Sequence, residues 1–370
     1  MRSNHPLLQE DHFKIGIFSA NCSGGLAATT VPERWNAGWD ENLALALAAD
    51  ELGIDFMLPI ARFTGYGGEA DFQGHSLETL VWATGLLAAT RRLTCFATVH
   101  TSFSHPVLAA KQFATADHVG HGRFGLNIVA GWNQPEYEMF GVELPEEHSK
   151  RYARAEEWWG VVSRIWQTSE TFDWDGQYFK LKNVQGLPKP FDGVPPILNA
   201  ASSAEGLQFA AANADFLFTV MTDFDRARAA VANLRKLAEA EARRVGILTT
   251  CYVVCRPTQK EADDYHRHYA ETFADGPGVE RLMELQGSHA KSFPPDAFEQ
   301  FRMRFAGGHG SYPLVGDPDY VAGELARIAS AGFDGTTVAF VDYTSELPYF
   351  AAEVFPRLEQ KGLRQPAASC

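Results

Sequence analysis

Short apolar runs and amphipathic helical patterns alternate about eight times along the chain, and this alternation constrains the fold more than any other feature. The apolar runs have the length and composition of buried strands, and they cover residues 13–19, 55–60, 93–99, 123–129, 195–201, 215–220, 247–254 and 336–341. Ala and Leu at helical spacing fill the segments 40–52, 105–120, 202–214, 223–244 and 317–332. Regular alternation of this kind predicts an α/β fold, the (β/α)8 TIM barrel.

Helix boundary signals support this interpretation. Pro106 suits the first turn of one predicted helix and Gly120 its C-terminal cap, while Asp317 and Gly332 bracket another. An open, doubly wound sheet is the alternative, and it would normally carry GxGxxG after the first strand. The segment SANCSGGLAA stands there instead, so the barrel is favoured.

The chain has 370 residues, which exceeds the roughly 250 of a minimal barrel. We expect a single barrel domain over residues 1–370, with short flexible tails at about 1–12 and 362–370. The excess falls after the fourth strand (132–151), in a predicted hairpin (171–184), and in 272–318, before the last helix–strand unit. The Gly-rich end of that last insertion, 306–318, is predicted to be a loop that closes over a ligand as a lid.

Charge and cysteine usage exclude several classes of protein. The net charge of −14 opposes nucleic acid and anionic membrane surfaces. No apolar run is long enough to span a bilayer, and the N-terminus lacks the order of a signal peptide, so a cytoplasmic location is expected. No CxxC occurs among the five cysteines, and Cys95, Cys251 and Cys255 are predicted to be small buried hydrophobes.

Polar residues follow the predicted strands at the end where a barrel places its active site. Arg62 opens a Gly-rich segment after the second strand, and Thr98 ends the third. Asn127 interrupts the fourth strand, and Trp132 and Glu136 follow it. A buried amide costs about 1–3 kcal/mol unless it is hydrogen-bonded. Asn127 is therefore predicted to contact a ligand, although a bond to a neighbouring loop is the simpler alternative.

A second group of residues suits a phosphate. Ser202 and Ser203 stand at the start of a helix after the fifth strand, where they serve either as an N-cap or as phosphate ligands. Arg151 and Tyr152 add a cation and a hydroxyl. No metal is expected, because the histidines match no known ligand spacing.

Taken together, several of these segments resemble a known family. RFTGYGGEADF, PVLAAKQFATADHVGHGRFGLNIVAGWNQPEYEMFG and SKRYARAEEW are similar to the bacterial-luciferase-like monooxygenases that use reduced FMN. The similarity is greatest to the pyrimidine, dimethyl sulfone and dibenzothiophene sulfone monooxygenases, and it extends from Phe13 to about Leu358.

The resemblance implies a role for each candidate residue. Thr98 and Asn127 would line the pocket where dioxygen meets the flavin, and Trp132 would form its wall. The implied FMN-binding residues are Ala61, Arg62, Asn127 and Glu136 around the ring, and Arg151, Tyr152, Ser202 and Ser203 around the phosphate. The implied reaction uses dioxygen and reduced FMN supplied by a separate NAD(P)H:flavin reductase, with the oxygen adduct at flavin N5 or at C4a. The family also suggests a homodimer or homotetramer.

One departure narrows the expected substrate. The related alkanesulfonate monooxygenases carry Arg and His in the seventh strand, where this chain has Thr250 and Tyr252. An anionic sulfonate would lose its partners, so we expect cleavage of a C–N, C–S or C–halogen bond in a neutral heterocycle, sulfone or halogenated aromatic. The alternatives are an F420-dependent dehydrogenase and a catalytically silent flavin-binding protein on the same barrel.

Overall fold

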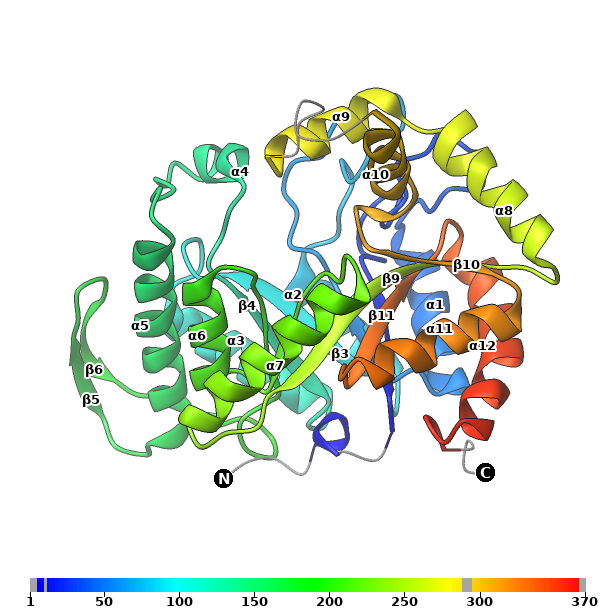
Figure 1. Cartoon of the computed structure of the whole chain (residues 1–370). Coiled ribbons are helices and arrows are strands. Elements are labelled where there is room, and N and C mark those ends of the chain that lie inside the picture. Colours follow the sequence, from blue (N-terminus) through cyan, green and yellow to red (C-terminus); the bar gives the residue numbers. More distant parts are fainter. Residues whose placement is uncertain (1–4, 10–11, 288–294, 366–370) are drawn as a thin grey trace. The chain divides into compact units, whose positions relative to one another are not determined.

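The structure is a computed structural model that describes residues 5–9, 12–287 and 295–365 (Figure 1). The chain forms two compact units, and each is built from alternating strands and helices. The first unit comprises Met1–Gln9, Thr79–Phe218 and Ala232–Gly246. The second comprises Glu10–Glu78, Thr219–Val231 and Ile247–Cys370. The expected single domain over 1–370 stays a prediction.

The first unit contains a parallel sheet in the order β3-β4-β7-β8. Its strands are β3 (Thr94–His100), β4 (Phe124–Val129), β7 (Ile197–Ala200) and β8 (Phe216–Phe218). Its helices are η1 (Pro6–Leu8), α2 (Thr79–Ala89), α3 (Pro106–Val119), α4 (Gln134–Met139), α5 (His148–Gln167) and α6 (Ala204–Asn213). The predicted hairpin is confirmed as β5 (Phe172–Asp175) and β6 (Lys180–Val184), which pair antiparallel. Helix α7 (Phe224–Ala240) has residues in both units.

The side chains of strand β4 alternate between the two faces of the sheet. Phe124 stacks on Phe113 of α3, with ring centroids 5.8 Å apart. Successive side chains of a strand point to opposite faces. Leu126 and Ile128 therefore share the helix-covered face with Phe124, and both are fully buried. Asn127 lies on the opposite face of the strand.

The second unit contains the parallel order β10-β9-β11-β1-β2. Its strands are β1 (Lys14–Phe18), β2 (Phe56–Leu58), β9 (Gly246–Cys255), β10 (Tyr312–Gly316) and β11 (Gly335–Ala339). Its helices are α1 (Trp39–Leu52), α8 (Gln259–Arg267), η2 (His268–Thr272), α9 (Gly276–Leu285), α10 (Pro295–Gly308), α11 (Pro318–Ser330) and α12 (Tyr343–Gln360). Asp317 caps α11 as predicted, because its Oδ1 accepts a hydrogen bond from the Tyr320 N–H at 2.8 Å.

The prediction that 306–318 is a loop is wrong. Ala306–Gly308 end α10, and Tyr312–Gly316 form β10, which pairs in register with Cys251–Cys255 of β9. Strand β10 stands at the end of the strand order, and Pro313 is tolerated there because an edge strand leaves some backbone N–H groups unpaired. A lid movement of this segment would have to break the pairing with β9. The lid is therefore not proposed further.

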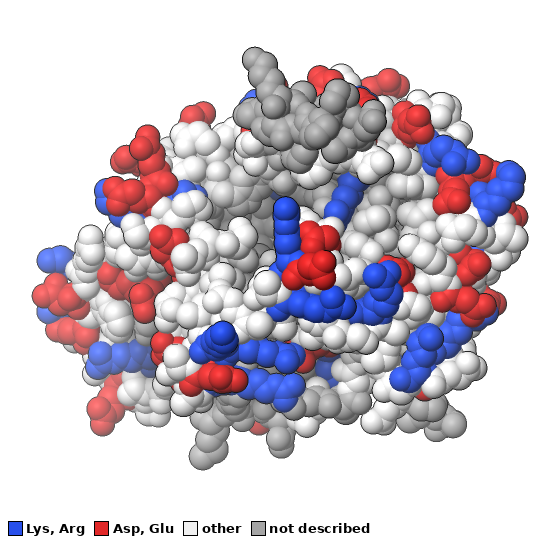
Figure 2. Space-filling view, in the orientation of Figure 1, with Lys and Arg blue, Asp and Glu red and all other residues white. Residues whose placement is uncertain are grey.

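The buried cysteines agree with the prediction from the sequence, and the surface carries charges of both signs. Cys95, Cys251 and Cys255 are buried and form no disulfide among the described residues, and burial raises the pKa of both the Cys251 and Cys255 thiols to about 12. Figure 2 shows acidic and basic side chains interspersed, many in short-range ion pairs such as Arg226–Asp223 and Arg228–Asp225. Among the described residues, every helix falls short of the length and apolarity needed to cross a membrane.

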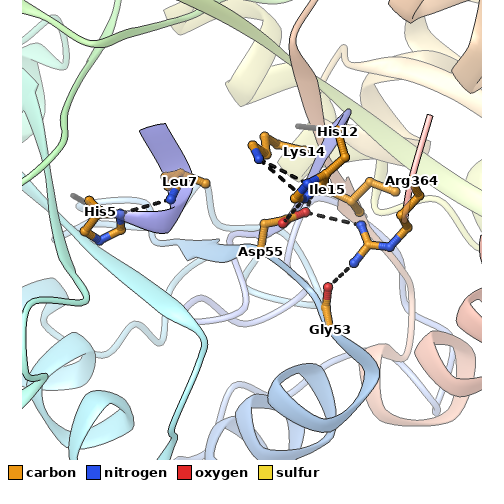
Figure 3. A network of polar contacts seen from close by, with 8 residues as sticks. All are labelled: His5, Leu7, His12, Lys14, Ile15, Gly53, Asp55 and Arg364. Atoms are coloured by element: carbon orange, nitrogen blue, oxygen red, sulfur yellow. Dashed lines mark hydrogen bonds and ion pairs between the residues drawn. The ribbon is translucent and has the colours of Figure 1, made fainter. Parts of the chain in front are cut away.

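A polar network in the second unit joins the two ends of its chain (Figure 3). The Asp55 carboxylate accepts hydrogen bonds from His12 Nε2 at 2.6 Å and from the Ile15 N–H at 2.8 Å, and Arg364 lies 3.3 Å away. Burial would raise the pKa of Asp55, but the His12 hydrogen bond and the Arg364 charge outweigh it and hold the pKa below its ordinary value. The carboxylate is therefore ionised in the folded protein.

We expect Asp55→Asn to lower the free energy of unfolding by about 3 kcal/mol at pH 7, because it leaves the Arg364 cation buried without its carboxylate. The Arg364 side chain is only 9% exposed. Urea unfolding measures the change. Asp175→Asn, which removes an ion-pair carboxylate that is 82% exposed, is the control and should change stability by less than about 1 kcal/mol. Equal effects of the two substitutions would contradict the claim that the Asp55 carboxylate stabilises the fold by pairing with the buried Arg364.

Candidate active site

Two polar side chains meet on one face of the first unit's sheet, opposite to the face that carries Phe124 and Leu126. Thr98 of β3 and Asn127 of β4 are paired in register, so their side chains project to the same side. The Asn127 Nδ2 group donates a hydrogen bond to Thr98 Oγ1 at 3.1 Å. Both side chains are buried, at 7% and 4% exposure. The structure thus brings together the two residues that the sequence predicted at the ends of neighbouring strands.

The other polar atom of the Asn127 amide has no hydrogen-bond partner among the described residues. Asn127 Oδ1 is buried and accepts no hydrogen bond there. A buried, unsatisfied acceptor costs about 1–3 kcal/mol. This cost is removed if a ligand supplies an N–H or O–H group at that point. The ligand contact predicted for Asn127 is consistent with this unsatisfied acceptor and stays a prediction.

The segment after β4 forms a short helix, α4, that fixes a carboxylate in a buried position. Glu136 is 1% exposed in the first turn of α4. The hydroxyl of the neighbouring Tyr137 lies 2.9 Å from the Ala130 carbonyl oxygen and 3.0 Å from Ser102 Oγ, which holds α4 against the ends of β3 and β4. Trp132 is 38% exposed, so its place as a pocket wall stays a prediction.

Helix α5 carries the predicted phosphate ligands near its N-terminus (Figure 1). The Arg151 guanidinium donates to the Gly131 carbonyl at 3.0 Å and to the Glu146 carbonyl at 3.0 Å, which ties it to the segment after β4. Its Nε is buried and has no acceptor among the described residues. Burial raises the pKa of the Tyr152 hydroxyl to about 12, so this group remains a neutral hydrogen-bond donor.

The start of helix α6 lies against Tyr152. Ser203 caps this helix by accepting a hydrogen bond from the Gly206 N–H at 3.2 Å, as the N-cap interpretation predicts. A Cβ at Gly206 would lie 2.5 Å from Tyr152 Oη, a separation that real structures do not show. Glycine is therefore required for the close approach of α6 to the hydroxyl. Ser202 is exposed beside the cap.

Ala61 and Arg62 belong to the second unit, where they follow β2. Ala61 is 9% exposed and Arg62 is 7% exposed. The Arg62 Nε donates to Gln73 Oε1 at 3.2 Å, and its guanidinium carbon lies 4.9 Å from the centre of the Tyr66 ring. These contacts hold the cation in a defined place at the end of its own strand.

Sequence reasoning missed Asn199. Its Nδ2 donates to the Ile128 carbonyl at 2.7 Å, its Oδ1 has no hydrogen-bond partner among the described residues, and the side chain is fully buried. The register pairs Asn199 with Ile128, so its side chain projects to the helix-covered face. There its amide makes a hydrogen bond with the Tyr152 hydroxyl, which lowers the pKa of that hydroxyl but does not outweigh the effect of burial. The signal was present in the sequence, because Asn199 interrupts an apolar strand as Asn127 does.

Comparison with known proteins places the chain in a family. The model of the luciferase-like monooxygenase family matches residues 13–335. The FMNH2-dependent dimethylsulfone monooxygenase of Pseudomonas fluorescens (strain Pf0-1) is 30% identical over 364 residues, which cover 95% of this chain and 96% of that protein. Pyrimidine monooxygenase RutA of Methylorubrum extorquens (strain PA1) is 28% identical, with 95% and 96% covered.

The fold has a counterpart among solved structures. DmoA from Hyphomicrobium sulfonivorans superposes with a TM-score of 0.86 at 20% identity, covering 97% of this chain and 90% of that one. The fold is therefore the (β/α)8 barrel that the alternation of strands and helices predicts. The chain belongs to the luciferase-like monooxygenase family, which confirms both the resemblance and the prediction of a monooxygenase.

Proposed function

We propose that this protein is a two-component monooxygenase that uses dioxygen and reduced FMN, in which Thr98 and Asn127 hold the reacting edge of the flavin. The observation that carries the proposal is the buried Thr98–Asn127 hydrogen bond together with the unsatisfied Asn127 Oδ1. The two closely matching relatives described above support it, because one is named as FMNH2-dependent and both as monooxygenases.

The residues present fit a flavin mononucleotide. The unsatisfied Asn127 acceptor suits an N–H group at the edge of a heterocycle. Arg151, Tyr152 and the N-terminus of α6 at Ser203 together offer a cation, a neutral hydroxyl and backbone N–H groups, which suit a phosphate. The bound cofactor would supply two electrons to dioxygen, so that one oxygen atom enters the substrate and the other leaves as water.

The side chains of this protein position the reacting atoms. The hydrogen bond from Asn127 Nδ2 to Thr98 Oγ1 fixes the two side chains relative to each other. Together they would place polar groups beside the oxygen on which negative charge develops. The buried position of both side chains excludes bulk water from the reacting atoms.

We infer a neutral substrate in which a C–N, C–S or C–halogen bond is cleaved. Thr250 and Tyr252 lie in β9 and are each 3% exposed. The Tyr252 hydroxyl lies 3.0 Å from His266 Nε2. The three nitrogens of the nearby Arg304 each donate to a backbone carbonyl, those of Ser311, Thr222 and Met221, so this cation is already held by the protein chain. We also propose that a separate flavin reductase supplies the reduced FMN, and that this protein forms a homodimer or homotetramer.

Binding of reduced FMN tests the phosphate site directly. We expect Gly206→Ala to raise the dissociation constant of reduced FMN about tenfold, because the new methyl group displaces Tyr152. Alanine favours a helix more than glycine does, but the new Cβ would also lie 2.5 Å from the Cβ of Ala201, so thermal unfolding of the variant is measured beside its FMN affinity. Gly323→Ala in α11 is the matched control, since a Cβ there meets nothing within 4 Å. Anaerobic fluorescence titration gives the constants.

Three different results would each contradict one part of the proposal. If Gly206→Ala binds reduced FMN as the wild type does, the phosphate is held elsewhere. If the wild type prefers F420, or reduces a substrate anaerobically, the protein is a dehydrogenase. If it binds reduced FMN but never couples oxygen consumption to product formation with neutral sulfones, pyrimidines or halogenated aromatics, the monooxygenase proposal fails.

A further inference from the structure

The Gly-rich segment that follows β2, residues 65–74, folds back on itself and is called the 65–74 loop below. The Tyr66 N–H donates a hydrogen bond to the Phe72 carbonyl at 2.9 Å, and the Phe72 N–H donates to the Gly67 carbonyl at 3.2 Å. Gly67 and Gly68 have φ angles of +70° and +84°. Glycine adopts such angles without steric cost, so the turn at this point depends on these two residues.

The two ends of the 65–74 loop hold a buried cation. Gln73 Oε1 accepts a hydrogen bond from Arg62 Nε at 3.2 Å, and the Tyr66 ring lies beside the guanidinium. Gln73 is fully buried, and its Nε2 donates to the Gly25 carbonyl at 2.8 Å. In a (β/α)8 barrel the active site is built at the carboxyl ends of the strands, where Arg62 follows β2. The loop therefore fixes the position of a cation at the end of a strand where ligands bind.

The middle of the 65–74 loop is bound by Asp275, which precedes α9 in the second unit. This side chain is 2% exposed. Its Oδ2 accepts a hydrogen bond from the Ala70 N–H at 2.7 Å, and its Oδ1 accepts one from the Glu69 N–H at 3.2 Å. Oδ1 also caps α9 by accepting from the Gly278 N–H at 3.4 Å. Hydrogen bonds from N–H groups to a carboxylate are about twice as strong as neutral ones.

We propose that Asp275 is a positioning residue, which holds the 65–74 loop so that Arg62 is fixed in place before the flavin binds. This inference rests on the proposed function and on the prediction that Arg62 binds FMN. Asp275 acts through the loop, because it bonds to backbone N–H groups in the middle of the segment whose ends hold Arg62. A cation that is already fixed loses little conformational entropy when its ligand binds.

One substitution separates the loop contact from the helix cap. Serine is as good an N-cap as aspartate, so Asp275→Ser keeps the cap of α9, but its single oxygen cannot accept from both loop N–H groups. Asp317→Ser is the matched control, because Asp317 caps α11 at the Tyr320 N–H. Arg62→Met removes the cation, and the double variant with Asp275→Ser tests whether the two residues act together.

The measurements are the dissociation constant of reduced FMN by anaerobic fluorescence titration, amide hydrogen exchange without flavin, and thermal unfolding. We expect Asp275→Ser and Arg62→Met each to raise the dissociation constant about tenfold, the effect of losing about 1.4 kcal/mol. The double variant should bind within about twofold of Arg62→Met alone, because Asp275 acts through Arg62. Exchange in the 65–74 loop should be faster in Asp275→Ser, and Asp317→Ser should match the wild type in both measurements.

A second pair of variants breaks the same contact from the loop side. A Cβ at Gly68 would overlap the Asp275 carboxylate, whereas a Cβ at Gly67 meets nothing within 4 Å. Both glycines have a positive φ, so alanine strains the backbone at either position. We expect Gly68→Ala to weaken the binding of reduced FMN at least about threefold more than Gly67→Ala does. This comparison also decides the matter if Asp275→Ser does not fold.

Four outcomes overturn the inference. Wild-type affinity for reduced FMN in Asp275→Ser, or equal effects of the two alanine variants, removes the positioning role. Additive losses in the double variant show that Asp275 acts independently of Arg62, as a residue that only stabilises the fold would. Wild-type affinity in Arg62→Met overturns the inference and leaves the proposed function standing. Failure of the wild type to bind reduced FMN refutes the proposed function, and the inference with it.

Discussion

Thr98→Val and Asn127→Leu are each expected to lower kcat by about 10²–10³, the usual cost of losing one preorganised donor to developing charge. Valine has the shape of threonine without the hydroxyl, and leucine is close in size to asparagine without the amide. Both residues are buried, so an apolar replacement of similar volume should not weaken packing. Reduced FMN should still bind, because the residues proposed to hold the phosphate remain.

The two residues form one hydrogen-bonded pair, and this gives a sharper test than either substitution alone. When Asn127 loses its Nδ2 donor, Thr98 Oγ1 loses a hydrogen bond that helps to fix its position. The double variant should therefore be about as slow as the slower single variant, and the separate losses should not add. Thr115→Val on the exposed face of α3 is the control and should leave kcat unchanged.

The measurements are steady-state turnover with a flavin reductase present and the ratio of product to oxygen consumed. A variant with wild-type kcat and coupling would remove its residue from the mechanism. Strict additivity of the two losses would show that the hydrogen bond between them does not matter to the reaction. Loss of FMN binding in both variants would place the pair in cofactor binding alone.

Local signals predicted most of the fold. Apolar runs of strand length, Pro106 at a helix start and Asp317 at an N-cap are decided by residues close in the sequence, and the structure confirms all of them. Strand β10 was missed because its run is short, contains Pro313 and is flanked by glycines. Its pairing with β9 is a long-range contact, which local composition does not encode.

The site residues, too, were only partly predictable from the sequence. Thr98 and Asn127 were found because a polar residue in an apolar strand stands out, and their pairing follows from the strand order. Asn199 gives an equal signal in the sequence, but it projects to the opposite face through its register with Ile128. Such relations appear only when the register is known.

The second large effect expected is a loss of stability as the pH falls from about 6.5 to 4. Burial lowers the pKa of His5 and of His266 from 6.5 to about 4, and that of His309 to about 3. Nearby cations act in the same direction: Arg123 on His5, Arg267 on His266 and Arg62 on His309. The folded protein therefore keeps these rings neutral at a pH where the unfolded chain already binds protons on them.

The sign of the effect follows from proton uptake. Between pH 6.5 and 4 the unfolded state binds more protons at these histidines, so acid favours unfolding, and the stability they provide is fully present only above 6.5. A shift from 6.5 to about 4 at a buried histidine such as His5 corresponds to at most about 3 kcal/mol. Glu346, whose pKa is raised by burial, opposes the trend in part.

Urea unfolding at pH 7, 6, 5 and 4 measures the dependence, and His309→Gln isolates one contribution. Glutamine retains a partner for the Tyr66 hydroxyl, which lies 3.3 Å from His309 Nε2, but it does not titrate. We expect the variant to lose about 2 kcal/mol less than the wild type between pH 7 and pH 4. His118→Gln, at an exposed histidine, should follow the wild-type curve. Parallel curves for His309→Gln and wild type would mean that His309 is protonated without cost in the folded protein, and so that its ring is reached by water.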